Sequence, residues 1–168
     1  HHNKTSVSMF PEASYSFDGT ATPLPSRLGL LFKRLNVPVI MVRTYGAFTR
    51  DPLYNGLKKR KVNVSAKVSV LFGKDELSSM SVQEMDERLE KAFSFDNFAW
   101  QKENGIVVGE KFRADGLERI LYKCPHCGSE GTTKGSGEYI KCSACGKTYF
   151  LNELGEISAT TGEKTEFS

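Results

Sequence analysis

No apolar run in this sequence approaches the roughly 20 residues that a membrane-spanning helix needs, and low-complexity tracts are also missing. Of the 168 residues, 39% are hydrophobic and 26% are charged. This balance is globular and excludes a mainly disordered, collagen-like or coiled-coil protein. Histidine is scarce: beyond the first two residues, only His126 remains as a histidine that could act as a general base. The length allows one ordinary domain, or one domain with a small appendage.

Positive charge is concentrated in the first part of the chain. Residues 1–74 carry 12 Lys and Arg against 3 Asp and Glu, whereas residues 75–168 carry 11 against 17. Such a basic stretch favours an anionic partner, for example a phosphate, a nucleic acid or an anionic membrane. The alternative interpretation is a solvated basic face without a dedicated partner.

The four cysteines form two Cys-x-x-Cys pairs with 14 residues between them. Two thiolates three positions apart on a tight turn hold one ion from one side, and a second pair completes a tetrahedron. Gly128 and Gly146 directly follow the pairs and permit the positive φ that such turns adopt. We therefore predict a structural zinc site with four ligands: Cys124, Cys127, Cys142 and Cys145.

Two other uses of these cysteines remain open from the sequence. Iron in a rubredoxin-like site is the main alternative metal, because thiolates bind both ions. Two disulfides are the other alternative, but neighbouring Cys-x-x-Cys pairs favour metal binding in a reducing compartment. We therefore expect a cytoplasmic protein.

Residues 3–74 have the pattern of an α/β fold. Strands are predicted at residues 5–10, 37–42 and 61–72, and the second is apolar throughout, which is typical of a strand buried on both faces. Ser26 is the predicted N-cap of an amphipathic helix over residues 27–35. A strand, a helix and a buried strand in succession indicate a crossover unit. We expect a partial, mainly parallel sheet with flanking helices.

A further helix is predicted after Ser81. With Glu84, Ser81 forms a capping box ahead of an apolar stripe that includes Met85 and Leu89. The aromatic stretch at residues 93–100 fits a packing role, and an apolar ligand surface is the alternative.

The predicted organisation has four parts: an α/β domain at residues 3–105, a connector at 106–122, a small β zinc ribbon at 123–152 and a tail at 153–168. Short strands are expected at residues 117–122, 138–141 and 148–151. A ribbon this small has little core, so bound metal must supply most of its folding free energy. The tail shows no apolar pattern, and we expect the natural chain to continue.

Two short motifs carry a family resemblance. Residues 9–16 read Met-Phe-Pro-Glu-Ala-Ser-Tyr-Ser, and residues 37–42 read Val-Pro-Val-Ile-Met-Val. With the basic segment that enters the strand at 61–72, they resemble the glycerolipid acyltransferase family, which includes the 1-acylglycerol-3-phosphate acyltransferases. The family's third motif reads Phe-Pro-Glu-Gly-Thr-Arg-Ser, and its fourth resembles Val-Pro-Val-Val-Pro-Val. Bacterial relatives with a zinc ribbon after the acyltransferase domain look similar along residues 5–150.

The resemblance implies that this chain is the C-terminal part of an acyltransferase. Such an enzyme moves an acyl chain from acyl-CoA or acyl-carrier protein to a hydroxyl of lysophosphatidate or glycerol 3-phosphate, with peripheral contact to the inner face of the membrane. Glu12 matches the motif's glutamate and would orient the acceptor. Ser14, Ser16 and Arg43 are further substrate-binding candidates, and Ala13 replaces the motif's glycine.

The family's catalytic His-x4-Asp motif is absent from this sequence. Because a hydroxyl needs a positioned general base to attack a thioester, we expect no catalytic residue in this chain and no activity of the chain alone. One alternative is a non-catalytic zinc-ribbon module that binds nucleic acid or protein, and another is a family member that has lost catalysis. Nucleic acid is disfavoured, because the basic residues lie away from the ribbon and are not interleaved with aromatics.

Overall fold

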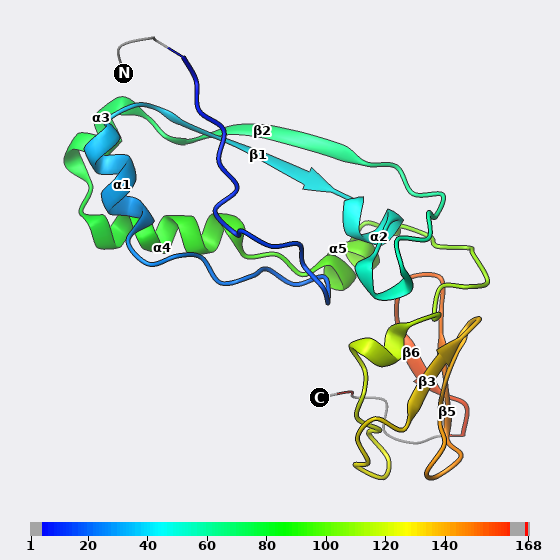
Figure 1. Cartoon of the computed structure of the whole chain (residues 1–168). Coiled ribbons are helices and arrows are strands. Elements are labelled where there is room, and N and C mark those ends of the chain that lie inside the picture. The colour runs from blue at the N-terminus through cyan, green and yellow to red at the C-terminus, as the bar shows by residue number, and fades with distance from the viewer. Residues whose placement is uncertain (1–4, 162–166, 168) are drawn as a thin grey trace. The chain divides into compact units, whose positions relative to one another are not determined.

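The computed structural model describes residues 5–161 and Phe167 (Figure 1). The described residues form two compact units, each assembled from separate stretches of the chain. The first comprises residues 5–15, Ala21–Met41 and Val68–Ser94, and the second comprises Ser16–Thr20, Val42–Lys67 and the described residues from Phe95 onward. The fold is mixed α/β with two small antiparallel sheets. No helix within the described ranges is long and apolar enough to cross a membrane.

Helices and the end of a strand form the core of the first unit. Helix α1 (Leu28–Leu35) packs on α4 (Val82–Phe93), and the short α3 (Lys74–Ser79) also contacts α1. Gly29 permits this packing, because a Cβ atom at its position would lie 2.7 Å from the Cβ of Met85. Six apolar side chains are buried in this core: Leu28, Phe32, Phe72, Leu77, Met85 and Leu89.

Both predicted helices occur, but only one begins as predicted. The Ser81 hydroxyl accepts a hydrogen bond from the Glu84 N–H at 3.2 Å, and the Glu84 carboxylate accepts one from the Ser81 N–H at 2.7 Å. This confirms the capping box of α4. The prediction of Ser26 as the N-cap of α1 is wrong. Arg27 holds that position with a left-handed φ of 64°, and its side chain makes no capping bond.

Strand β1 (Val39–Tyr45) pairs with β2 (Ser65–Phe72) in a two-stranded antiparallel sheet (Figure 1). The expected parallel arrangement is therefore not what these strands form. A parallel pair needs a crossover connection, usually a helix of several turns. The connection between β1 and β2 instead contains α2 (Ala47–Arg50) and a single 3₁₀ turn, η1 (Leu53–Asn55), which bring the chain back in the opposite direction.

Two strand predictions need correction in this part of the chain. Residues 5–10 form no strand, and Val7 and Phe10 are 90% and 88% exposed. Their alternating pattern is not sufficient, because a strand is stable only beside a partner strand. β1 is not buried on both faces either, since its residues alternate between half-buried and exposed, with Ile40 and Val42 exposed.

The second unit combines short helical elements with a sheet. In addition to α2 and η1 it contains α5 (Asn97–Glu103) and the 3₁₀ turn η2 (Leu117–Arg119). Gly116 lies directly against η1, because a Cβ atom at its position would lie 2.2 Å from the Tyr54 carbonyl oxygen. The core of this unit comprises eight buried residues: Tyr54, Ala114, Leu117, Cys124, Ile140, Cys142, Tyr149 and Leu151.

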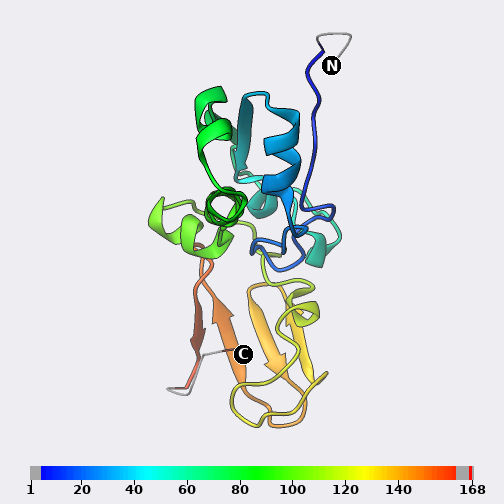
Figure 2. The ribbon, with the colours of Figure 1, turned by 90° about the vertical axis from the view of Figure 1, so that its left-hand side faces the viewer.

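Four antiparallel strands form the ribbon, in the order β3-β4-β5-β6 (Figure 2). Their bounds are Thr133–Ser136, Tyr139–Cys142, Thr148–Leu151 and Ile157–Ala159. The second and third agree with the predicted strands at 138–141 and 148–151. The strand predicted at 117–122 is wrong, because these residues begin with η2. β3 and β6 were not predicted, and β6 lies in the stretch that was expected to be a patternless tail.

The aromatic stretch at residues 93–100 supplies packing contacts. Phe93 packs against the core of the first unit. In the second unit, the rings of Phe95 and Trp100 lie 5.8 Å and 5.7 Å from the ring of Tyr45. These contacts agree with the packing interpretation of the stretch.

Candidate metal centre

The two Cys-x-x-Cys pairs come together at one end of the ribbon. Their four Sγ atoms all lie within 4.8 Å of one another. The Sγ atoms of Cys124 and Cys145 are 3.8 Å apart, as are those of Cys127 and Cys142. A tetrahedral zinc ion with Zn–S bonds of about 2.3 Å places its sulfur ligands about 3.8 Å apart. The cluster therefore has the donor atoms and the spacing to hold one metal ion.

The two pairs share the same backbone turn. The N–H of Gly128 donates to the Cys124 carbonyl and that of Gly146 to the Cys142 carbonyl, both at 2.9 Å. Both glycines have a positive φ, 71° and 74°, which agrees with the sequence prediction. The backbone N–H of Cys124 donates to the carbonyl of Ser129, five positions further on, and Cys142 does the same with Lys147. Backbone hydrogen bonds thus shape both turns in the same way.

Burial differs among the four thiols. Cys124 and Cys142 are buried within the core of the second unit, Cys145 is half-buried and Cys127 is exposed. The centre is therefore anchored in packed side chains on one side and open to solvent on the other.

Hydrogen bonds tune the acidity of the cluster. Desolvation raises the pKa of Cys142, but hydrogen bonds from the Thr132 hydroxyl and from backbone N–H groups of the same turn outweigh it and lower that pKa to about 6. The backbone N–H of Lys147 lowers the pKa of Cys145, but desolvation and the neighbouring cysteine sulfurs outweigh it and raise that pKa to about 12. One thiol therefore ionises readily and another resists. A bound divalent cation would favour ionisation of all four thiols, because coordination stabilises their thiolate forms.

Side chains outside the cysteine motif also contact the sulfurs. The Thr132 hydroxyl lies 3.3 Å from the Sγ of Cys142, and the Tyr149 hydroxyl lies 3.6 Å from the Sγ of Cys124. Sequence reasoning missed both. Thr132 is separated from Cys142 by a hairpin in the sequence. Around Tyr149 the only sequence pattern is the alternation typical of a strand, which gives no sign of a contact with Cys124. The Phe167 ring packs edge-on against the Tyr149 ring, with 5.1 Å between the ring centres. Phe167 therefore has a packing role.

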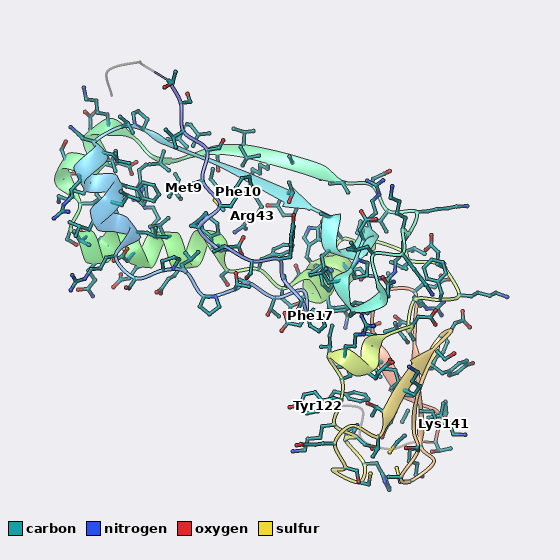
Figure 3. The ribbon with its side chains drawn as sticks, viewed as in Figure 1. Met9, Phe10, Phe17, Arg43, Tyr122 and Lys141 are labelled. Carbon is teal, nitrogen blue, oxygen red and sulfur yellow. The ribbon has the colours of Figure 1, made fainter. Side chains whose placement is uncertain are left out.

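The predicted acceptor-binding residues fall into both units. In the first, the Ser14 hydroxyl donates to the Glu12 carbonyl, and the half-buried Glu12 carboxylate accepts from the Thr22 hydroxyl, both at 3.4 Å. Phe10, two positions before Glu12, carries an exposed ring (Figure 3). Glu12 and Ser14 are thus close to each other, on a turn closed by a bond from the Ala13 N–H to the Phe10 carbonyl.

Ser16 and Arg43 belong to the second unit. The Ser16 hydroxyl closes a local turn, because it donates to the Thr20 carbonyl at 2.7 Å and accepts from the Gly19 N–H at 2.9 Å. The Arg43 guanidinium lies 5.7 Å above the centre of the Phe95 ring, within the aromatic cluster described above (Figure 3). The described contacts of Ser16 are thus with the backbone of its own turn, and that of Arg43 is with an aromatic ring.

Comparisons with protein-family models, curated proteins and solved structures give no match for this chain.

Proposed function

We propose that this chain is the C-terminal part of a glycerolipid acyltransferase whose ribbon holds a structural zinc ion. The full-length enzyme would transfer an acyl chain from acyl-CoA or acyl-carrier protein to a hydroxyl of lysophosphatidate or glycerol 3-phosphate. Because such acceptors are lipids or lipid precursors, the proposal includes peripheral contact with the inner face of the membrane.

The conformation of Ala13 is the observation that carries the acyltransferase proposal. Its φ is 54°, in the left-handed region that favours glycine. The family motif that residues 10–16 resemble has glycine at this position. An alanine that adopts a glycine conformation, directly after the glutamate of the motif, supports the assignment of Phe10–Ala13 as the family's turn.

The chemistry assigns this chain a positioning role. In the full-length enzyme, a histidine from the His-x4-Asp motif would take the proton of the acceptor hydroxyl as its oxygen attacks the thioester carbonyl. The new ester C–O bond forms, the C–S bond breaks, and the thiol leaves with a proton. Glu12 would orient the acceptor's hydroxyl groups, with Ser14 beside it in the motif. Ser16 and Arg43 stay substrate-binding candidates on the resemblance.

The exposed strands support the proposal of a larger sheet with flanking helices. Apolar residues on both strands of the β1-β2 sheet are exposed: Ile40, Val42, Val68 and Val70. Strands with exposed apolar side chains are typical of a sheet that is covered in the complete fold. We propose that neighbouring strands and helices of the full-length enzyme cover them.

Zinc is the proposed ion of the cysteine centre. Four thiolates at tetrahedral spacing form a closed ligand set, which is typical of structural rather than catalytic zinc. The ion would stabilise the ribbon and take no part in acyl transfer. Elemental analysis of the purified chain should find about one zinc per chain, and iron in that position would contradict the choice of metal.

The enzyme proposal is tested with the full-length protein, lysophosphatidate and an acyl thioester, by following release of the free thiol. We expect Glu12→Gln to lower the rate at least about tenfold, because the acceptor loses its orienting carboxylate. Glu103→Gln, which removes an exposed carboxylate at the end of α5, is the matched control and should keep the wild-type rate. Thiol release at background level with several acyl donors would contradict the enzyme and favour a family member without catalysis.

A further inference from the structure

Tyr149 on β5 places a buried hydroxyl beside the cysteine centre. Its side chain is buried in the core of the second unit, and its backbone pairs with Ile140 and Ala159 on the neighbouring strands. The Phe167 ring packs against its own ring. These contacts fix the direction in which the ring points. A buried tyrosine hydroxyl needs hydrogen-bond partners in the protein, because it has lost those that water would supply.

Two groups of the first Cys-x-x-Cys turn meet this hydroxyl. The backbone N–H of His126 forms a hydrogen bond with the Tyr149 oxygen, and the Sγ of Cys124 lies 3.6 Å from that oxygen. Since an N–H group can only donate, the Tyr149 oxygen accepts the bond from His126, and its own proton is directed to the sulfur. A metal-bound sulfur is a thiolate and has no proton to give. The hydroxyl is therefore oriented as a donor to Cys124.

The charge of a tetrathiolate centre explains why a donor is needed at this place. Four thiolates around one divalent ion leave two negative charges in excess. Cys124 and Cys142 are buried, so part of this charge is removed from water, and buried charge is costly unless hydrogen bonds compensate it. The exposed Cys127 can receive such bonds from water. Tyr149 supplies a donor to Cys124, on the side of the centre that faces the core.

Thr132 offers a second hydroxyl to the centre, but it has two acceptors within reach. Its oxygen lies 3.3 Å from the Sγ of Cys142 and 3.4 Å from the carbonyl oxygen of Ser129. A hydroxyl has one proton, so these two acceptors compete for it. We therefore expect Thr132 to contribute less to metal binding than Tyr149.

We propose that Tyr149 is a positioning residue of the metal centre, whose hydroxyl donates a hydrogen bond to the Cys124 thiolate and holds this sulfur toward the bound ion. This role rests on the proposed metal binding by the four cysteines, and it is independent of the acyltransferase assignment. The hydrogen bond compensates part of the sulfur's charge, so the folded ribbon retains the ion more tightly. Because His126 and Cys124 belong to the same turn, one side chain of β5 also joins that turn to the sheet.

Tyr149→Phe tests the role, because it removes the hydroxyl and keeps the buried ring. Competition with a chelator of known affinity should show zinc binding weakened about tenfold. Tyr139→Phe removes a hydroxyl from an exposed ring on β4 of the same ribbon and is the matched control, with a zinc affinity within about twofold of wild type. Thr132→Val should give a smaller loss than Tyr149→Phe.

Cobalt(II) in place of zinc gives a readout that a loss of packing would not change. The thiolate-to-cobalt charge-transfer bands depend on the energy of the sulfur lone pairs, which a donated hydrogen bond lowers. We expect these bands at longer wavelength in Tyr149→Phe and at the wild-type position in Tyr139→Phe.

A measurement on the unsubstituted chain does not depend on the folding of any variant. With a magnetically active cadmium isotope bound, the Tyr149 hydroxyl proton should show a scalar coupling to the metal through the Cys124 sulfur. The N–H of Lys147, which hydrogen-bonds Cys145, should show the same kind of coupling and is the internal reference.

The proposal is overturned if the coupling of Lys147 is observed and that of Tyr149 is absent. It is also overturned if Tyr149→Phe and Tyr139→Phe have the same zinc affinity and the same cobalt bands. An unsubstituted chain that binds none of the three metals would refute the metal centre itself, and the role of Tyr149 with it.

Discussion

Glycines, which have no Cβ atom, permit close approaches of the backbone within the second unit. Gly116 has a φ of 80°, and a Cβ atom there would lie 2.2 Å from the Tyr54 carbonyl oxygen. Gly105 also has a positive φ, 62°, but nothing lies within 4 Å of the corresponding Cβ position. Alanine at Gly105 would meet only the strain of a left-handed backbone, whereas alanine at Gly116 would also collide with Tyr54. Comparing the two variants therefore separates these two contributions to the free energy of unfolding.

We predict that Gly116→Ala destabilises the second unit by about 3 kcal/mol, because backbone strain and a collision with Tyr54 add together. Gly105→Ala has the strain alone and should cost about 1 kcal/mol. Denaturant unfolding followed by the fluorescence of Trp100, which belongs to the same unit, measures both. Equal losses for the two variants would show that the close approach at Gly116 does not constrain the unit.

At the scale of elements, the cap of α4 links helix stability to pH. The pKa of Glu84 is lowered from its ordinary value of 4.5, first by the hydrogen bond from the Ser81 backbone N–H and then by the one from the Ser81 hydroxyl. A carboxyl group with a lowered pKa in the folded state stabilises that state while it is ionised. The stabilisation is therefore complete above pH 4.5 and is lost as the pH falls through the lowered pKa.

We predict that Glu84→Gln makes the protection of α4 less dependent on pH below 4.5, because the capping group no longer titrates. Amide hydrogen exchange of α4, measured across the acid range, tests this. Glu90→Gln removes an exposed carboxylate of the same helix that is not part of the cap, and its protection should follow the wild-type pH profile. A wild-type profile for Glu84→Gln would refute the role of the cap.

Elements with local signals were predictable from the sequence, and elements that depend on distant partners were not. The capping box at Ser81 and the glycine turns of the cysteine pairs each depend on neighbours within a few residues. The strand predicted at 5–10 failed because pairing requires a second strand that the pattern does not specify. The segment at 117–122 failed because Gly116 starts a 3₁₀ turn against η1, a contact across about 60 residues of sequence.

The residues of the candidate metal centre also fall into those that local sequence predicts and those that depend on distant partners. The four sulfur ligands follow from spacing alone, whereas Thr132 and Tyr149 reach the sulfurs only because the sheet pairs β3, β4 and β5. The cations at Arg50 and Arg60 are ten residues apart in the sequence, and a backbone bond from the Arg60 N–H to the Arg50 carbonyl at the end of α2 brings their segments together.

At the scale of the whole molecule, the two cores share no residue. The cysteine centre contributes Cys124 and Cys142 to the core of the second unit, whereas the core around α1 and α4 contains no cysteine. Metal binding is therefore linked to the folding of one unit, and the other has its own source of stability.

We predict that removal of the metal with a chelator abolishes amide protection in β3–β6 while α1 and α4 keep theirs. Structural zinc contributes on the order of 10 kcal/mol to the folding free energy of small zinc domains. Without this contribution we expect the ribbon to unfold. Hydrogen exchange with and without chelator gives the comparison. Cys127→Ser should reproduce the effect of the chelator, and His126→Ala, in the same turn but without a sulfur ligand, should not. Unchanged protection of the ribbon after removal of the metal would contradict a structural role.

The two-stranded sheet of β1 and β2 has a consequence for handling the isolated chain. Among the described residues each of these strands has one neighbour, so one backbone edge of each strand is unpaired. Val68 and Val70 alternate with small or charged side chains on an exposed strand. Open edges with exposed β-branched side chains are templates for self-association. Self-association of this chain should therefore increase steeply with its concentration, and a charged substitution such as Val68→Lys should reduce it without changing the folded structure.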